Sequence, residues 1–275
     1  MENLAAFKPI SVKSMIAKKN KKTADRIPKF IYNWLTKILH IDEINGLIKK
    51  YGHFHGTDFA DALLEDFNVK VEIRGAENIP KEGRFIFASN HPLGGFDGIL
   101  IMSRISKFTK SKVKFLVNDF LMYIYPLQEI FLPINKMGGQ AKESARKIDE
   151  VYESDQQILI FPAGLCSRKK HKTIKDLAWN KHFIQRAIKN KRDIIPIHIS
   201  GRNSNWFYNL SNFRKRLGIK FNLEMLYLSD EMFKQRGNSF TITIGKPIPY
   251  TTFNKNRTHK DWAEWVESKV YDMVQ

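Results

Sequence analysis

The residues best suited to chemistry lie in one short segment, ASNHPLGGFDGILI, which follows an apolar run and leads into a run with helical spacing. Five residues separate His91 from Asp97, among them Gly94 and Gly95. An imidazole can remove the proton of an alcohol, and a neighbouring carboxylate fixes its tautomer and stabilises the imidazolium. Glycine adopts backbone conformations that other residues avoid, so the turn can bring His91 and Asp97 together. The segment predicts a general base, unless Asp97 only caps the helix and His91 is an ordinary loop residue.

Seven short apolar or alternating runs predict the strands that position this segment. They are VKVEIRG, RFIFASN, KVKFLVN, EIFLPIN, QILIFPAG, IIPIHISG and FTITIGKPI. Helices are predicted between them at 97–106, 140–154 and 175–191. Strands that alternate with helices predict an α/β fold, in which a mixed central sheet is flanked by helices and sites lie at strand ends.

Residues 1–67 are patterned differently. The first 25 residues are rich in lysine and weakly patterned, which predicts a flexible basic arm or a solvated tail. Apolar side chains recur at helical spacing over residues 27–51, which predicts an amphipathic helix broken near Asp42. A second helix is predicted in DFADALLEDF, where four apolar side chains share one face: Phe59, Leu63, Leu64 and Phe67.

These N-terminal helices either cover the core or lie in a membrane interface. Basic flanks and Trp34 make the interfacial position as good an interpretation as the core for the first helix. We therefore expect residues 1–67 to form a basic arm with amphipathic helices, and residues 68–275 to form the catalytic domain.

Composition narrows the partners. Lys and Arg number 46 against 28 Asp and Glu, a net charge of +18, which predicts an anionic partner such as nucleic acid, an anionic bilayer or an acidic carrier protein. No apolar run is long enough to span a membrane, and no secretory signal opens the chain, so any membrane contact is expected to be peripheral. The single cysteine, Cys166, excludes an intramolecular disulfide and favours a reducing, cytoplasmic compartment.

Four segments resemble, in order and spacing, the motifs of the lysophospholipid (glycerolipid) acyltransferase superfamily, and together they cover about residues 71–249. NHPLGGFD is similar to the first motif, Asn-His followed by four residues and Asp, and FPAGLCSRK to the third, Phe-Pro-Glu-Gly-Thr-Arg-Ser. FLPINK resembles the second, with Lys136 where most members have an arginine that contacts acceptor phosphate. IIPIHISG, around Pro196, resembles the fourth, an apolar strand ending in proline.

The resemblance implies an acyltransferase without a cofactor, in which His91 accepts the proton of the acceptor hydroxyl and Asp97 orients His91. It also implies a set of substrate-binding positions: Asn90, Gly94, Gly95, Lys136, Phe161, Pro162, Gly164, Ser167 and Arg168. Lys136 and Arg168, with Lys169, would hold anionic groups, and backbone N–H groups of the glycine turn or the next helix would stabilise the oxyanion.

Two departures from the motifs point to one branch of the superfamily. His91 and Asp97 are separated by five residues rather than four, and Ala163 replaces the glutamate of the third motif. Both features resemble the branch long labelled "hemolysin", which includes the O-acyltransferases that complete bacterial ornithine and glycine lipids. That branch implies a lyso-aminolipid acceptor, an acyl carrier protein or acyl-CoA donor, and a location on the cytoplasmic face of the inner membrane. A 1-acyl-glycerol-3-phosphate acyltransferase is the alternative.

Other chemistries leave weaker signals. Cys166, beside Ser167 and Arg168, is either an activated nucleophile for an acyl-enzyme route or a small buried hydrophobe. The pair His53 and His55 lacks acidic ligands in metal spacing, and a serine hydrolase is disfavoured because no G-x-S-x-G occurs. The net charge alone supports a nucleic-acid-binding protein, and only the branch label supports haemolysis; we expect neither nucleic acid nor metal to bind.

Overall fold

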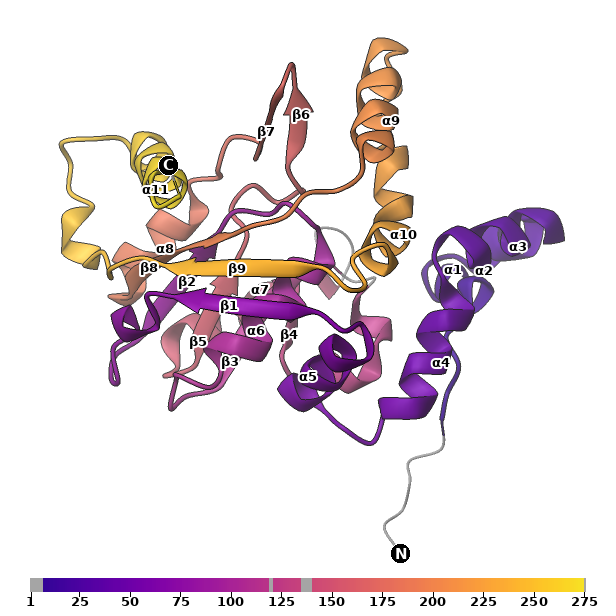
Figure 1. Ribbon diagram of the computed structural model, residues 1–275, viewed down its shortest axis with the longest axis horizontal. Coiled ribbons are helices and arrows are strands. Elements are labelled where there is room, and N and C mark those ends of the chain that lie inside the picture. Colours follow the sequence, from indigo (N-terminus) through magenta and orange to yellow (C-terminus); the bar gives the residue numbers. More distant parts are fainter. Residues whose placement is uncertain (1–6, 119–120, 135–139, 275) are drawn as a thin grey trace, which may run out of the picture.

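The computed structural model describes residues 7–118, 121–134 and 140–274, and within these ranges one large sheet forms the centre of the molecule (Figure 1). Its strands are β1 (Lys70–Arg74), β2 (Phe85–Ser89), β3 (Val113–Val117), β4 (Phe131–Pro133), β5 (Gln157–Ile160), β8 (Asp193–Ile199) and β9 (Ser239–Ile244). They lie in the order β1-β9-β8-β2-β5-β3-β4. The five strands from β8 to β4 are parallel, while β9 is antiparallel to β8 and β1 is parallel to β9. The predicted mixed sheet is thus confirmed.

Helices cover both faces of this sheet, as Figure 1 shows. They are α5 (Gly56–Asp66), α6 (Gly95–Ile105), α7 (Gln140–Glu153), α8 (His182–Asn190) and α11 (His259–Asp272). Successive residues of β2 divide between two apolar cores: Phe85 and Phe87 join the core that includes α5 and α6, and Ile86 and Ala88 join the core that includes α8 and α11. This alternation follows from the two-residue period of a strand.

The central strands could be predicted because both of their faces are covered. All five residues of β2 and all four of β5 are buried, so these strands appear in the sequence as continuous apolar runs. The edge strand β1 has no buried residue among its five, all of which are described, and it carries charged residues in alternation. The seven predicted strands all coincide with strands of the sheet.

The N-terminal region is helical. It contains α1 (Val12–Lys19), α2 (Lys21–Arg26), α3 (Lys29–Ile38) and α4 (Ile41–Tyr51). The prediction of a flexible arm or solvated tail is therefore wrong for residues 12–26, where Ser11 caps α1 and Val12, Met15 and Ala24 are buried. The long predicted helix ends earlier than Asp42, because His40 takes a left-handed conformation (φ 51°) between α3 and α4.

The second predicted N-terminal helix is confirmed as α5, whose shared apolar face packs into the core. Phe59, Leu63, Leu64 and Phe67 are each at most 4% exposed.

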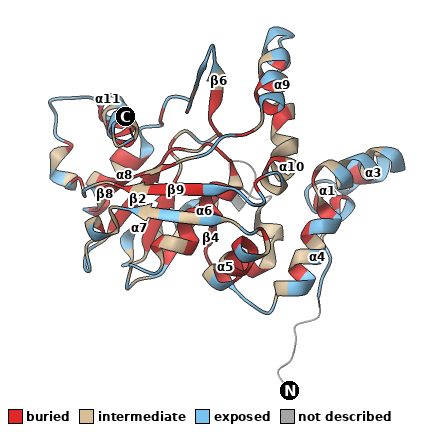
Figure 2. Ribbon diagram, viewed as in Figure 1, coloured by how far each residue is buried: buried red, intermediate tan, exposed pale blue. Residues whose placement is uncertain are grey.

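The region between β5 and β9 differs most from the prediction. The helix expected over 175–191 begins only at His182, because Thr173–Lys175 forms β7, which pairs with β6 (Arg168–Lys170) in a small hairpin. Two helices, α9 (Asn205–Arg216) and α10 (Leu228–Phe233), were not predicted. Figure 2 shows the buried residues concentrated in the sheet, while α3 and the far end of α9 are mostly exposed. In the described part of the chain, no helix is long and apolar enough to cross a membrane.

Candidate active site

The turn between β2 and α6 brings His91 and Asp97 into contact. Gly94 has φ 77° and ψ −141°, a conformation that a side chain would strain, and it reverses the chain immediately before α6. As a result, Nδ1 of His91 lies 2.9 Å from Oδ2 of Asp97, which also accepts the backbone N–H of Leu93 at 2.9 Å. Asp97 is fully buried, whereas the side chain of His91 is 13% exposed. The pair therefore meets solvent only through the imidazole.

Burial governs the protonation of this pair. It raises the pKa of Asp97 to about 6, although the hydrogen bond and charge of His91 act to lower it. Oδ1 of Asp97 has no hydrogen-bond partner among the described residues. The ionised carboxylate can only accept, so in a neutral imidazole Nδ1 donates to it and the free lone pair is on Nε2. That tautomer is the one a general base needs.

Three further contacts hold the His91 loop. The ring of Phe161 stacks on the imidazole with centroids 4.1 Å apart and planes at 16°. The backbone N–H of His91 donates to Oδ1 of Asp176 at 3.1 Å, and its carbonyl accepts the N–H of Ser167 at 2.7 Å. The histidine is thus fixed by both its ring and its backbone.

Asp176 is a functional candidate that the sequence did not reveal. Its carboxylate also accepts the hydroxyl of Ser167 at 2.5 Å and the indole N–H of Trp179 at 3.0 Å. Asp176 is separated from His91 by 85 residues and lies outside the four motifs, so no local pattern pointed to it. It joins the first and third motifs around one buried carboxylate.

Asn90 connects the same turn to the neighbouring strand. Its amide donates to the carbonyl of Ile199 at 2.9 Å and accepts the N–H of Ile199 at 2.8 Å. Asn90 is 3% exposed, so its side chain is placed to hold the turn against β8 and not to contact a substrate.

The third motif lies beside the turn. Pro162 and Ser167 are buried, while Gly164 is exposed at a left-handed position (φ 69°). Gly95 begins α6, where a Cβ atom would meet Leu121 at an ordinary 3.6 Å, so the space there does not demand glycine.

The neighbouring Gly98 does require glycine, and sequence reasoning missed it. A Cβ atom at this position would lie 2.0 Å from the ring of Phe115, so α6 sits directly on β3. This close packing sets the distance between the sheet and the helix that carries Asp97.

Arg168 occupies a different environment from the one predicted for an anion-binding residue. It is 6% exposed, and its guanidinium donates to Glu224 at 3.0 Å and to the carbonyl of Cys166. Glu224 also accepts two hydrogen bonds from Arg214, at 2.8 and 3.1 Å. The charge of Arg168 is thus compensated inside the protein by Glu224, and its role in substrate binding stays a prediction. Lys136 lies outside the described residues.

Cys166 does not fit the acyl-enzyme alternative. It is fully buried beside Phe207 and Tyr208, and burial raises the pKa of its thiol to about 11 despite the charge of Arg168. A protonated, inaccessible thiol is a poor nucleophile, so the predicted alternative of a small buried hydrophobe applies. Among the described residues, no group of three His, Cys, Asp or Glu side chains is arranged to hold a metal.

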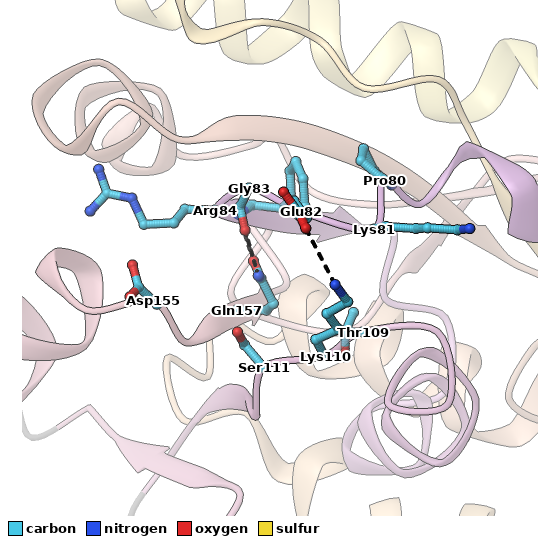
Figure 3. A pocket seen from close by; sticks show the side chains of 11 residues that line it. Pro80, Lys81, Glu82, Gly83, Arg84, Thr109, Lys110, Ser111, Asp155 and Gln157 are labelled. Carbon is cyan, nitrogen blue, oxygen red and sulfur yellow. Dashed lines mark hydrogen bonds and ion pairs between the residues drawn. The ribbon is translucent and has the colours of Figure 1, made fainter.

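A cavity of about 270 Å³ lies at the opposite end of the sheet (Figure 3). Phe85 and Gln157, which begin β2 and β5, line it, whereas His91 follows the other end of β2. Two pairs of its polar groups contact each other: Lys110 with Glu82 at 3.3 Å, and the Gln157 amide with the carbonyl of Gly83 at 2.9 Å. The cavity is therefore remote from the His91 pair.

The structure thus shows an α/β fold with a buried His–Asp pair at a strand end, and sequence comparison gives the family of the chain. Residues 14–275 match the family model described as "Acyltransferase". The chain therefore belongs to the acyltransferase family and is an acyltransferase, as the motifs predicted. This favours the enzyme over the nucleic-acid-binding and haemolytic alternatives.

Two relatives are similar along almost the whole chain. A lyso-glycine lipid O-acyltransferase of Bacteroides thetaiotaomicron is 48% identical over 264 residues, covering 96% of this chain and 97% of that protein. A protein of the same name from Phocaeicola vulgatus is 45% identical over 264 residues, covering 96% and 95%. The crystal structure of the 1-acyl-sn-glycerophosphate acyltransferase PlsC from Thermotoga maritima is similar at a TM-score of 0.48 and 17% identity, covering 89% of this chain and 97% of that one.

Proposed function

We propose that this acyltransferase moves a fatty acyl group from a thioester, on acyl carrier protein or coenzyme A, to the hydroxyl of a lyso-glycine lipid. The observation that carries the proposal is the 2.9 Å contact between His91 and Asp97 in a chain 48% identical to a protein of that name. The acceptor hydroxyl belongs to a 3-hydroxy fatty acid amide-linked to glycine. No cofactor takes part.

The proposed reaction is a direct transfer from donor to acceptor, without a protein nucleophile or an acyl-enzyme. Nε2 of His91 takes the proton of the acceptor hydroxyl while that oxygen attacks the thioester carbonyl. The tetrahedral intermediate collapses, the C–S bond breaks, and His91 returns the proton to the departing thiolate. Asp97 keeps the imidazole in the required tautomer throughout. Backbone N–H groups in the first turn of α6, beside Gly94 and Gly95, are suited to stabilise the oxyanion.

Substrate recognition is proposed for the remaining motif residues. Lys136 is assigned to the carboxylate of the acceptor or a phosphate of the donor, with Lys169 as a second cation. The ring of Phe161 stacks on the imidazole, so it is positioned to meet the reacting end of a substrate. The exposed turn at Gly164, whose N–H donates to the carbonyl of Phe161, is assigned to the same role.

The enzyme is proposed to work as a peripheral protein on the cytoplasmic face of the inner membrane, with residues 1–67 as its membrane-facing region. None of the residues of α3, all of which are described, is buried; Phe30 is 70% and Trp34 is 46% exposed. Aromatic side chains among lysines are typical of interfacial helices. Since Ile44 and Ile48 of α4 pack into the main core, replacing Phe30 and Trp34 by serine tests this contact better than deleting the region.

The function is tested by lipid mass spectrometry on cells that receive a lyso-glycine lipid and express either the wild type or His91→Ala. The proposal expects the diacylated glycine lipid with the wild type alone. Lysophosphatidate supplied in parallel is the control acceptor. Acylation of lysophosphatidate without the glycine lipid product would leave the acyltransferase in place and reject the proposed acceptor.

A further inference from the structure

Helix α9 has one buried face and one exposed apolar face. Its buried face is formed by Phe207, Tyr208, Ser211 and Arg214. On an adjacent face, Trp206, Leu210, Phe213 and Leu217 recur at helical spacing and form what we term the outer stripe. Trp206 is 46%, Phe213 60% and Leu217 59% exposed. Solvent-exposed apolar residues occur singly on most proteins, so a continuous stripe calls for a partner.

The loop after α9 continues the stripe and adds positive charge. Ile219 is 38% and Phe221 61% exposed, and the cations Lys215, Arg216 and Lys220 are exposed among them. The sequence contains no Asp or Glu from 201 to 223. Large apolar side chains thus alternate with cations in a segment without a carboxylate.

A buried ion cluster holds this surface in a fixed shape. Arg214 donates to the carbonyl of Ile219 at 2.7 Å, which ties the loop to the helix, and it pairs with the fully buried Glu224. Glu224 pairs in turn with Arg168 of the third motif. The ion cluster therefore fixes α9 and its loop, and through Arg168 it connects them to the third motif beside the active site.

Helix α10 contacts both the catalytic turn and the junction of α3 and α4. Its Leu228 packs so close to Gly94 that an added Cβ atom would lie 3.0 Å away. Its Asp230 contacts Nε2 of His40 at 3.2 Å, and its Phe233 stacks on the same imidazole at 4.7 Å, at the junction of α3 and α4. Figure 1 shows α9 and α3 both standing clear of the sheet near α10.

We propose that the outer stripe and its loop bind the surface of an anionic bilayer, as a second contact beside α3 that lets the catalytic turn face the lipid. The inference rests on the proposed function in that it gives the lyso-lipid acceptor a direct route from the bilayer. Trp and Phe side chains enter the headgroup boundary, and cations attract anionic lipid. An acidic carrier protein would match the cations, but the stripe of exposed aromatic and leucine side chains suits an acyl boundary better.

The test is flotation of the full chain with vesicles of phosphatidylglycerol and phosphatidylcholine in equal parts. In one variant Phe213, Leu217 and Phe221 are all replaced by serine. The matched control is Phe108→Ser, which changes a side chain 42% exposed in the turn that follows α6. We expect about tenfold or greater loss of vesicle binding for the triple variant and none for the control. Vesicle binding by the triple variant equal to that of the wild type overturns the proposal. A triple variant that loses binding to acyl carrier protein but keeps binding to vesicles overturns it as well.

A second measurement does not depend on the triple variant folding. A Leu217→Cys variant can be labelled selectively with an environment-sensitive dye, because the native Cys166 is fully buried. The proposal expects a blue shift on vesicles and quenching by bromolipids, with neither in Phe108→Cys; a dye that stays in water at position 217 overturns it.

Activity separates this proposal from the function itself. In detergent micelles the triple variant should acylate lyso-glycine lipid as the wild type does, and lose activity only on vesicles. If neither protein acylates the lipid in either form, the proposed function fails while the vesicle binding still decides the role of the outer stripe.

Discussion

Asp97 and Glu224 are both 0% exposed, but their pKa values are shifted in opposite directions. Burial acts to raise the pKa of Glu224, but the hydrogen bonds and charges of Arg214 and Arg168 bring it below its ordinary value. Burial also acts on Asp97, whose one side-chain hydrogen-bond partner among the described residues is His91, and there it raises the pKa to about 6. Equal burial therefore gives one permanent charge and one group that titrates near neutrality.

The different partners of the two carboxylates indicate different roles. Glu224 is compensated by two guanidiniums, so it ties α9 and the hairpin β6–β7 to the body of the protein. Asp97 is left with Oδ1 unpartnered among the described residues, which costs stability and is characteristic of a functional site. Removing the partner of Asp97 should damage the chemistry, and removing the charge of Glu224 should damage the fold.

The largest effect is expected for His91→Ala. Loss of the general base should lower kcat about 10³-fold or more, since general base catalysis contributes on the order of 10²–10⁴. The melting temperature should fall as well, because the substitution removes a ring that packs on Phe161 and contacts the buried Asp97, so activity is assayed where both proteins are folded. Steady-state assays and a thermal melt on the same sample check this. Retention of a tenth of the wild-type activity would remove His91 from the mechanism.

Glu224→Gln should have its effect on stability. It leaves two buried guanidiniums without a compensating charge, which we expect to cost about 3–5 kcal/mol in the free energy of unfolding. Urea unfolding measures this. The matched control is Glu150→Gln, which removes an exposed pair with Arg146 at 2.9 Å and should cost less than about 1 kcal/mol. Equal stability of the two variants would show that the buried cluster is not the frame we describe.

The sequence predicted the parts of this comparison that are local. His91 and Asp97 lie in one turn after a buried strand, so spacing and apolar pattern indicated both the pair and its place at a strand end. Their contact is observed, and their catalytic role stays a prediction. The strands were predicted because burial on two faces leaves continuous apolar runs.

The remaining parts depend on contacts between distant segments. Arg168 and Glu224 are 56 residues apart, and nothing near Arg168 indicates that its charge is compensated. The helix predicted from residue 175 failed for a local reason: Thr173–Lys175 pairs with the nearby Arg168–Lys170 in a hairpin, and helical spacing does not reveal this pairing.

Asp97→Asn should raise stability while it lowers activity. The pKa of Asp97 is about 6 in the folded protein against 3.8 as the ordinary value. The free energy of unfolding is therefore highest below pH 4, where the carboxyl is protonated, and falls as the pH rises through 6 and the buried group ionises. The variant should therefore be more stable than the wild type by on the order of 1–3 kcal/mol at pH 8, and this gain should vanish towards pH 4. Activity should fall about 10²-fold or more, because the amide no longer fixes the tautomer.

The pH dependence of unfolding tests whether the raised pKa of Asp97 causes this difference in stability. Melts of both proteins between pH 4 and pH 8 should converge at the acid end. A constant difference across this range would mean that folding does not raise the pKa of Asp97, and would end the contrast with Glu224.

The smallest effect is expected for Asp176→Asn, because Asp176 acts on Asp97 through its charge and not through a direct hydrogen bond. The negative charge of Asp176 is one of the causes that raise the pKa of Asp97, so its loss should move the acid limb of the activity profile from about pH 6 to lower pH. An amide also cannot accept from His91, Ser167 and Trp179 together, because one of its ends donates. The looser turn should lower kcat about tenfold with little change in KM. A merely structural role would lower activity equally at every pH, whereas a positioning role through Asp97 requires the acid limb to shift.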